Sequence, residues 1–343
     1  MKKIILIILV SLNLLSCANG ENKPTTIINL EGTEWDVSES LASVLGILPF
    51  NDYLLVHNIN SETELTLFDT KSKSHLLNFG HTGRAYGEVF NSTNILVDKN
   101  FVSVYVSAKG AFVNFDLEDV KNIKISEKKV GDNTDRYVSM CKLTDLTYLA
   151  SGIFPSEKRF LMFDDTSLSY IGDYPKNALI DESMPYNIEG SAYKSLLCSH
   201  PTQSKFVAAN AYGKKLHIFK YNTSNREIDE VCVVGSKDPV FEIKKPGGYP
   251  NFKPTEKTIW GYRDVISDNN YIYALYSGRP QISRTPFLKS DLVEVYDWDG
   301  NLQCILKLDR DINRMTVVGN TIYAIVDMPE KGYNIVEYIL PKL

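Results

Sequence analysis

Short runs of hydrophobic residues that alternate with polar ones, each ended by turn-forming residues, occupy nearly all of the 343-residue chain after its first two dozen positions. Alternation with a period of two predicts β-strands that bury one face. Helical periodicity is almost absent, and only residues 38–45 are expected to form a turn or two of helix. The 20 Tyr and 15 Phe residues strengthen this picture, because aromatic residues favour strands. The pattern predicts an all-β protein.

The strand-like runs form a repeat. A hydrophobic residue, an aromatic residue and a polar turn-starter recur at intervals of 42 to 75 residues, and each copy follows another strand-like run. The aromatic positions are Phe68, Phe115, Phe163, Tyr221, Tyr296 and Tyr338. Repeats of about 40 to 50 residues with four short strands are typical of propeller blades, because one blade cannot bury both faces of its sheet. Six copies therefore predict a six-bladed β-propeller with four-stranded antiparallel blades.

The two ends of the chain are expected to meet and close this ring. The run TTIINL at residues 25–30 is expected to complete the sheet that YNIVEYIL begins at residues 333–340. Closure leaves only short, protected strand edges. A pair of β-sandwiches is the alternative architecture, although it requires no such repeat.

The widest gap in the repeat contains a long segment, residues 236–264, with four prolines and two adjacent glycines. This composition predicts an extended excursion over the surface rather than a strand. Its aromatic side chains either line a binding cleft or fasten the segment to the blade beneath it, and the sequence leaves both open. These residues are Phe241, Tyr249, Phe252, Trp260 and Tyr262.

The N-terminus carries the most specific signal. Lys2 and Lys3 precede an apolar run too short to span a bilayer as a stable helix, which is typical of a secretory signal. The ending Leu-Leu-Ser-Cys at residues 14–17 resembles a bacterial lipobox, in which the cysteine becomes the acylated first residue. We therefore predict a lipoprotein signal peptide at 1–16, a lipidated Cys17 with a tether at 17–24, and one propeller domain at 25–343. An ordinary secretory peptide with an incidental cysteine is the alternative.

The predicted anchor and the charge of the chain limit its partners. Two or three acyl chains hold a protein on a membrane stably. We therefore expect a lipid-anchored protein of the outer membrane or cell envelope of a diderm bacterium, with its face of the membrane left open. The net charge of −5, or −7 without the two N-terminal lysines, argues against a nucleic-acid partner. We expect the propeller to be monomeric.

Four cysteines follow the predicted anchor and form no C-x-x-C pair, so zinc-ribbon and thioredoxin chemistry are not supported. An oxidising compartment permits disulfides, and no pairing can be deduced. Cys232 and Cys304 lie in strand-like runs, where buried free thiols are favoured over disulfides. The remaining two are Cys141 and Cys198.

Three glycines, at positions 80, 83 and 87, mark the stretch FGHTGRAYGEVF. A phosphate-binding loop needs a helix after its glycines, whereas the sequence that follows here predicts a strand, a turn and a second strand. The stretch is therefore predicted to be the crossing between the first two blades, with glycines that serve backbone geometry.

The same stretch carries a family resemblance. Residues 80–90, followed by Ile-x-Val-Asp at 95–98, are similar to the G-x-x-G-x-G-P-G-E-F phrase of TolB-like six-bladed propeller lipoproteins, and NHL-type propellers carry a related phrase. Ala85 and Tyr86 stand where the family has glycine and proline. Residues 260–264, 271–278 and 295–301 extend the resemblance over essentially the whole mature chain. The resemblance implies a propeller fold and a cell-envelope location, and it implies no reaction.

Local motifs for metals or catalysis are not assembled in the sequence. The five histidines lack metal-binding spacing, no G-x-S-x-G motif occurs, and His57 and His217 lie in strand-like runs as packed residues. The acidic run at 297–301 lacks the Glu that an EF-hand needs at its twelfth position, so it predicts a hairpin with positive φ at Gly300. We expect no cofactor, and calcium held in the central channel by acids from several blades is left open.

A candidate ligand-binding set lies in or beside segments that connect blades. Arginine side chains at a channel mouth would grip an anionic or sugar ligand through their planar fork. The alternative roles are solvent-facing side chains and intramolecular ion pairs. The set comprises Arg84, Tyr86, Glu88, Tyr249, Trp260, Tyr262, Arg263 and Arg279.

Two classes of function follow from these observations. The first is a non-catalytic binding or scaffold lipoprotein for an envelope protein or a glycan. The second is a hydrolase or lyase at the channel mouth, metal-assisted or not, which predicts convergent carboxylates with shifted pKa values. An apolar channel lining would argue against the second class.

Overall fold

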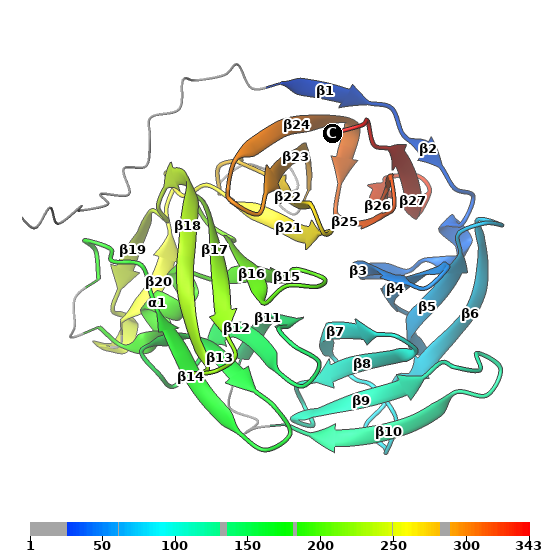
Figure 1. The fold of residues 1–343 in the computed structure, drawn as a ribbon, viewed down its shortest axis with the longest axis horizontal. Helices are drawn as coiled ribbons and strands as arrows, with labels where there is room; N and C mark the ends of the chain where they lie inside the picture. The colour runs from blue at the N-terminus through cyan, green and yellow to red at the C-terminus, as the bar shows by residue number, and fades with distance from the viewer. Residues whose placement is uncertain (1–25, 61, 131–135, 181–183, 249, 282–288) are drawn as a thin grey trace, which may run out of the picture.

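The computed structural model describes residues 26–60, 62–130, 136–180, 184–248, 250–281 and 289–343. Within these residues the chain forms six antiparallel four-stranded sheets arranged in a ring, one of them extended by a fifth strand (Figure 1). The predicted six-bladed β-propeller is confirmed. The first strand of each blade faces the centre of the ring (Figure 1).

The first four blades each use four consecutive strands. Blade 1 contains β3 (Ser43–Phe50), β4 (Tyr53–Ile59), β5 (Thr63–Asp69) and β6 (Ser74–His81). Blade 2 contains β7 (Ser92–Asp98), β8 (Phe101–Val106), β9 (Ala111–Asp116) and β10 (Lys124–Lys129). Blade 3 contains β11 (Arg136–Lys142), β12 (Tyr148–Ile153), β13 (Lys158–Phe163) and β14 (Leu168–Asp173). Blade 4 contains β15 (Ser195–Ser199), β16 (Lys205–Asn210), β17 (Lys214–Asn222) and β18 (Glu227–Lys237).

The last two blades combine strands from both ends of the chain. Blade 5 contains β21 (Tyr262–Ser267), β22 (Tyr271–Tyr276), β23 (Ser290–Asp297), β24 (Leu302–Ile312) and the N-terminal β1 (Ile27–Leu30). Blade 6 contains β25 (Arg314–Val318), β26 (Thr321–Met328), β27 (Gly332–Ile339) and the N-terminal β2 (Thr33–Glu34).

The ring closes between the chain ends as predicted, but the predicted closing strand was wrong. Residues 25–30 were expected to pair with the C-terminal strand, whereas β1 pairs in parallel with β24 of blade 5. The closing strand is β2, only two residues long, in which Thr33 pairs with Glu337. Hydrophobic alternation identified β1 as a strand but could not name its partner, and a two-residue strand has no alternation to detect. Gly32 joins the two strands where a Cβ atom would overlap the side chains of Val336 and Tyr338.

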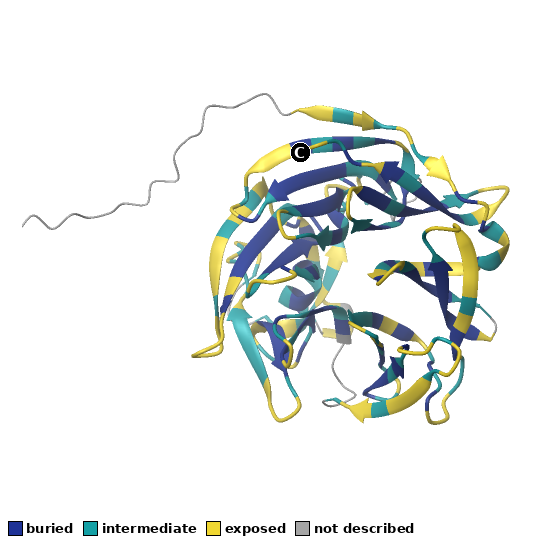
Figure 2. Cartoon of the chain, turned by 45° about the vertical axis from the view of Figure 1, so that its right-hand side comes forward, coloured by how far each residue is buried: buried dark blue, intermediate teal, exposed yellow. Residues whose placement is uncertain are grey.

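The six repeated aromatic residues share one structural role. Each lies at or near the end of the third strand of its blade, is at most 5 % exposed, and packs against the preceding blade. Phe115 of blade 2, for example, makes an edge contact with Phe79 of blade 1 at 5.2 Å between ring centroids. The core is therefore divided into six inter-blade layers, and exposed residues concentrate on the outermost strands (Figure 2).

The polar residue after the aromatic residue starts the turn to the fourth strand. The Oδ1 atom of Asp69 accepts hydrogen bonds from the backbone N–H groups of Lys71 and Ser72, at 3.0 and 2.7 Å. Asp164 and Asp297 accept backbone hydrogen bonds in the same way. Side chains of Asp and Asn can mimic a turn of backbone, which explains their place in the repeat. Gly300 has φ +87°, so the predicted hairpin at 297–301 is confirmed.

The long excursion differs from the sequence-based expectation. Residues 236–264 were predicted to lack strands, but they contain a hairpin of β19 (Phe241–Lys244) and β20 (Asn251–Pro254), joined through a 3₁₀ turn at Pro246–Gly248. Proline is tolerated here because the hairpin is a separate two-stranded sheet with open edges. The short helix α1 (Tyr186–Ala192) was also not predicted. The helix expected at 38–45 is one 3₁₀ turn, Ser38–Ser40.

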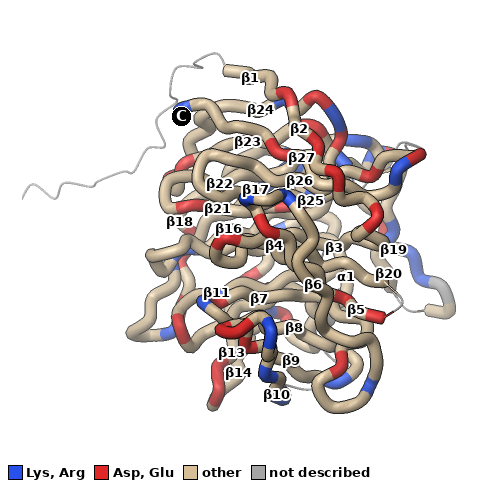
Figure 3. The backbone as a smooth tube through the Cα atoms, turned by 90° about the vertical axis from the view of Figure 1, so that its right-hand side faces the viewer, with Lys and Arg blue, Asp and Glu red and all other residues tan. Residues whose placement is uncertain are grey.

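Side chains of both charges are mixed over the surface. Lys and Arg alternate with Asp and Glu along the side shown in Figure 3. Most ion pairs join neighbouring strands or turns, such as Lys158 with Asp173 at 2.6 Å. No helix among the described residues is long and apolar enough to cross a membrane.

Candidate functional site

One end of the central channel contains a cavity of about 540 Å³. All six inner strands contribute to its lining, and most of the side chains are apolar. Among the described residues that line it, Lys99 and Lys142 are the only ones with charged side chains, and Lys142 is paired with Asp98 at 2.7 Å. One apolar residue from each inner strand illustrates the lining: Ile47, Ile95, Met140, Leu197, Val265 and Val317.

Two thiols also lie in this lining. Cys141 of β11 and Cys198 of β15 line the cavity as free cysteines, and burial raises the pKa of both, that of Cys198 to about 12. Thiols with raised pKa values are poor nucleophiles at neutral pH. Neither Cys304 nor Cys232 forms a disulfide with a described residue, as predicted, but only Cys304 is buried, whereas Cys232 is partly exposed.

The opposite mouth of the channel is polar. Inner strands β3, β7, β11 and β21 each have an irregular register near their first residues. The guanidinium of Arg314 in β25 donates hydrogen bonds to the carbonyl oxygens of Leu45 in β3 (2.8 Å) and Arg263 in β21 (3.2 Å). One side chain thus connects the inner strands of blades 5, 6 and 1.

Arg263 and Asp264 lie beside Arg314 at this mouth. The guanidinium of Arg263 is 5.2 Å from the ring centroid of Trp260, a cation–π distance. Burial and the neighbouring Arg314 lower the pKa of Arg263 to about 10. Burial raises the pKa of Asp264, whose Oδ2 accepts the backbone N–H of Met315 at 2.9 Å. The mouth therefore presents aromatic and cationic groups together.

The structure holds three further members of the predicted set at the outside of blade 2. Arg84, Tyr86 and Glu88 lie in the crossing from blade 1 to blade 2, which is held against the outermost strand of blade 2: the N–H of Gly87 donates to Glu127 at 2.7 Å. Lys109 donates to the carbonyl oxygens of Ala85 and Glu88, at 2.6 and 2.8 Å. Tyr86 is 71 % exposed.

The glycines of this crossing serve backbone geometry, as predicted. Gly80 and Gly87 have φ of +70° and +78°, a region that other residues rarely adopt. A Cβ atom on Gly83 would overlap the carboxylate of Glu88. The segment leads into β7 and not into a helix.

The aromatic residues of the excursion mostly fasten it to the ring. Phe241 and Phe252 pack with each other and with the cluster around Ile188 and Tyr193. Tyr262 is fully buried and donates a hydrogen bond to Glu294 at 3.0 Å. Tyr249 lies outside the described residues.

Arg279, which was predicted to bind a ligand, forms an intramolecular ion pair instead. Its guanidinium donates to Asp311 and its carbonyl oxygen accepts the N–H of Trp260 at 2.8 Å. The structure therefore brings together Trp260, Arg263 and Arg279, whereas Arg314 and Asp264 were not predicted. Arg314 begins its inner strand and Arg263 is the second residue of its own, so a blade-by-blade alignment of the repeat would have placed the two arginines close together.

A Ser–His–Glu cluster lies between blades 1 and 2. Ser92 Oγ is 2.7 Å from His57 Nε2 and also bonds to Glu64. In a hydrolytic triad the acid holds the other imidazole nitrogen, Nδ1, while the serine faces substrate. Here Glu64 is on the Nε2 side at 3.8 Å, and all three residues are buried. Burial alone would raise the pKa of Glu64, but the hydrogen bonds from His57 and Ser92 outweigh it and lower that pKa. The cluster therefore holds blades 1 and 2 together and does not have the arrangement of a catalytic triad.

The described residues contain no group of three or more His, Cys, Asp or Glu side chains placed to hold a metal ion. The predicted lipidation site Cys17 and the boundaries at residues 16 and 24 lie outside the described residues.

The fold and the channel define the class of this protein as a six-bladed β-propeller with an apolar channel and one polar mouth. The chain belongs to the TolB-like six-bladed propeller family, whose model matches residues 41–320. No curated protein sequence matches the chain.

Solved structures share the fold at low sequence identity. A putative exported protein from Bacteroides fragilis is 14 % identical with a TM-score of 0.57, and the alignment covers 93 % of this chain and 100 % of that one. The WD40 domain of Pan2 from Neurospora crassa is 10 % identical with a TM-score of 0.50 and coverages of 92 % and 95 %. A luciferin-regenerating enzyme is 8 % identical with a TM-score of 0.50 and coverages of 90 % and 95 %. Identities this low establish similarity of fold alone.

Proposed function

We propose that this protein is a non-catalytic binding or scaffold propeller of the cell envelope, anchored through a lipid on Cys17, that docks an envelope protein or a glycan. The lining of the channel cavity carries the proposal. Apolar side chains from all six inner strands meet there, and the lining contains neither a carboxylate nor an imidazole. Hydrolysis or elimination at such a place would need acids or bases that converge on the substrate.

The polar mouth is the docking face that we favour. Trp and Arg are enriched among the residues that dominate binding energy at interfaces, and Trp260 and Arg263 lie together there. The rigid ring of inner strands holds these side chains in place before a partner arrives, which lowers the entropic cost of binding. The signal-like N-terminus and the family of the chain support the envelope location.

The anchor is tested by metabolic labelling with a fatty acid. We expect the wild-type chain to be labelled and to fractionate with membranes, and Cys17→Ser to be neither labelled nor membrane-bound. An unlabelled wild-type chain that fractionates as a freely soluble protein would overturn the anchored location.

Docking is tested with the purified chain on a glycan array and against envelope proteins as purified single partners. We expect specific binding to one of them, weakened about tenfold by Arg263→Ala, since a central hot-spot residue contributes on the order of 1.4 kcal/mol or more. The matched control is Lys71→Ala, which removes an exposed ion pair with Asp52 in blade 1. Turnover of a small molecule, without binding of any partner, would contradict the proposal.

A further inference from the structure

A second cavity, of about 280 Å³, lies between blades 2 and 3, away from the channel mouth. Its walls come from strands β8, β9 and β10 of blade 2 and from β12 and the β13–β14 turn of blade 3. A volume of about 300 Å³ is at the lower end of the range for ligand-binding pockets. It has room for one ring-sized ligand.

The cavity exists because two polar residues replace a hydrophobic pair of the repeat. The residue before each repeated aromatic points to the next blade, together with its cross-strand partner on the second strand. In blades 1, 3 and 5 both members of this pair are buried aliphatic, Met or aromatic residues: Leu55 with Leu67, Leu149 with Met162, and Tyr273 with Val295. In blade 2 the pair is Ser103 with Asn114.

In blades 4 and 6 the residue before the repeated aromatic is also polar, but water or a neighbouring side chain satisfies its polar groups. Lys220 of blade 4 is exposed to water. Glu337 of blade 6 accepts a hydrogen bond from Trp35 Nε1 at 3.2 Å and pairs with Lys73. By contrast, the side chains of Ser103 and Asn114 make no hydrogen bond with any described residue, although both are partly buried and line the cavity. A half-buried amide without a partner destabilises a fold unless a ligand or water satisfies it.

Aromatic rings form the floor of the cavity. Phe112, Tyr148 and Phe163 all line it. The rings of Tyr148 and Phe163 are 5.5 Å apart and 22° from parallel, and those of Phe112 and Phe163 are 6.3 Å apart and 27° from parallel. The hydroxyl of Tyr148 has no hydrogen-bond partner among the described residues either, so it adds a third polar group to the site.

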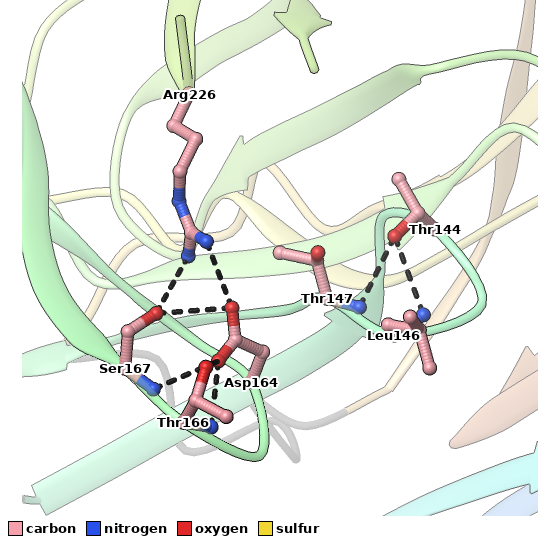
Figure 4. Close-up of polar contacts among 7 residues, drawn as sticks. All are labelled: Thr144, Leu146, Thr147, Asp164, Thr166, Ser167 and Arg226. Atoms are coloured by element: carbon pink, nitrogen blue, oxygen red, sulfur yellow. Dashed lines mark hydrogen bonds and ion pairs between the residues drawn. The ribbon is translucent and has the colours of Figure 1, made fainter. Parts of the chain in front are cut away.

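Another part of the lining is a turn held by several hydrogen bonds, which follows Phe163 directly in the chain. Asp164 accepts hydrogen bonds from the backbone N–H groups of Thr166 and Ser167, each at 2.8 Å, and from Arg226 of blade 4 at 2.8 Å (Figure 4). These bonds hold the pKa of Asp164 well below its usual range, so the carboxylate is committed to the turn. Lys128 and Asp165 form an ion pair across the rim between the two blades. The site is therefore held in shape before a ligand arrives.

We propose that this cavity, formed by Ser103, Asn114, Tyr148 and the rings of Phe112 and Phe163, binds one pyranose ring of a glycan. A pyranose presents C–H groups on its faces and hydroxyls around its edge, so it matches an aromatic floor with free hydroxyl and amide groups beside it. An amide supplies both a donor and an acceptor, which suits a hydroxyl. The inference goes beyond the proposed docking at the polar mouth, because it assigns a second, separate binding site to a single sugar ring.

The test uses the full-length protein and four probes: methyl α-D-glucopyranoside, methyl β-D-galactopyranoside, N-acetylglucosamine and glucuronic acid. Binding is followed by saturation-transfer NMR and calorimetry, with indole as an aromatic comparison. We expect at least one sugar to bind. We expect Asn114→Leu, which restores one member of the hydrophobic pair found in blades 1, 3 and 5, to weaken that binding at least tenfold while Tm stays equal or rises.

The matched control is Met162→Leu, at the same position of the repeat in blade 3, which should leave sugar binding unchanged. Binding that survives Asn114→Leu would overturn the proposal, as would binding of indole alone. If all four sugars fail to bind while a purified partner still docks in a way that depends on Arg263, the pocket inference fails and the proposed function stands. If neither sugar nor partner binds and a small molecule is turned over, both fail.

Discussion

At the scale of single residues, burial favours the neutral form of two histidines. Burial lowers the pKa of both His200 and His217, although Glu230 opposes the effect at His217 through a 2.8 Å contact with Nδ1. The Nδ1 atom of His200 accepts the backbone N–H groups of Thr202 and Gln203, both at 3.1 Å, so it must carry no proton.

Stability should therefore fall as the pH is lowered from 7.5 to 5.5. A histidine whose pKa is lower in the folded state contributes stability that is complete above its unfolded pKa of about 6.5 and is lost as the pH falls below it, because the unfolded chain then binds more protons. We expect His200→Asn to lose less stability over this range than the wild type, measured as urea midpoints. Exposed His81→Asn is the control and should keep the wild-type pH dependence; an equal slope for His200→Asn would contradict the assignment.

The polar mouth also shows which features of a site cannot be predicted from the sequence. Trp260 and Arg263 were predicted and do meet, but Tyr262 between them is buried on the other side of the strand. Alternation fixes which residues share a face only until a bulge shifts the register, and the irregular pairing between Tyr262 and Asp264 does so here. Neither a bulge nor a hydrogen bond between Arg314 and Leu45, far apart in sequence, has a local signature.

At the scale of elements, the repeated aromatic and its Asp or Asn were enough to predict the blades. The pattern identified the third strands because each of its two positions has its own physical role. The aromatic residue packs in the layer between two blades, and the Asp or Asn after it starts the turn. Elements without such a pair of residues were not predicted. The prolines in and around the hairpin β19–β20 argued against strands, and α1 has only seven residues.

The aromatic positions should accordingly be the most sensitive sites of the strands. We expect Phe115→Ala to lower the free energy of unfolding by about 3–5 kcal/mol, since it leaves a cavity between blades 1 and 2. The control is Phe101→Ala on β8 of the same blade, where the side chain is 48 % exposed. Chemical denaturation of both variants decides the matter, and similar losses for the two would show that the inter-blade layer is not the source of stability.

At the scale of the whole molecule, stability depends on a closure made by few residues. β2 offers two residues to β27, supported by Trp35, which is 2 % exposed and packs in the layer between blades 6 and 1. Arg310 pairs with Glu34 across blades 5 and 6. The overall architecture was predictable because each blade repeats a local pattern, whereas the register of the closure depends on contacts between opposite ends of the chain.

Removal of residues 1–34 should open the ring, because it deletes both N-terminal strands. We expect a lower Tm and a broader thermal transition than for a chain that lacks only residues 1–25. The two truncations differ by β1 and β2, so the shorter deletion is the control. Identical thermal transitions would mean that blades 5 and 6 hold together without them.

The same closure sets the order in which the molecule can be completed. Trp35 and Glu337, whose side chains meet at the clasp, are 302 residues apart along the chain. Contacts between distant residues form late, because the entropy of closing so large a loop must be overcome first. Strand β2 therefore waits for β27: until the last blade has been synthesised, β27 is absent and the edge of β2 has no partner.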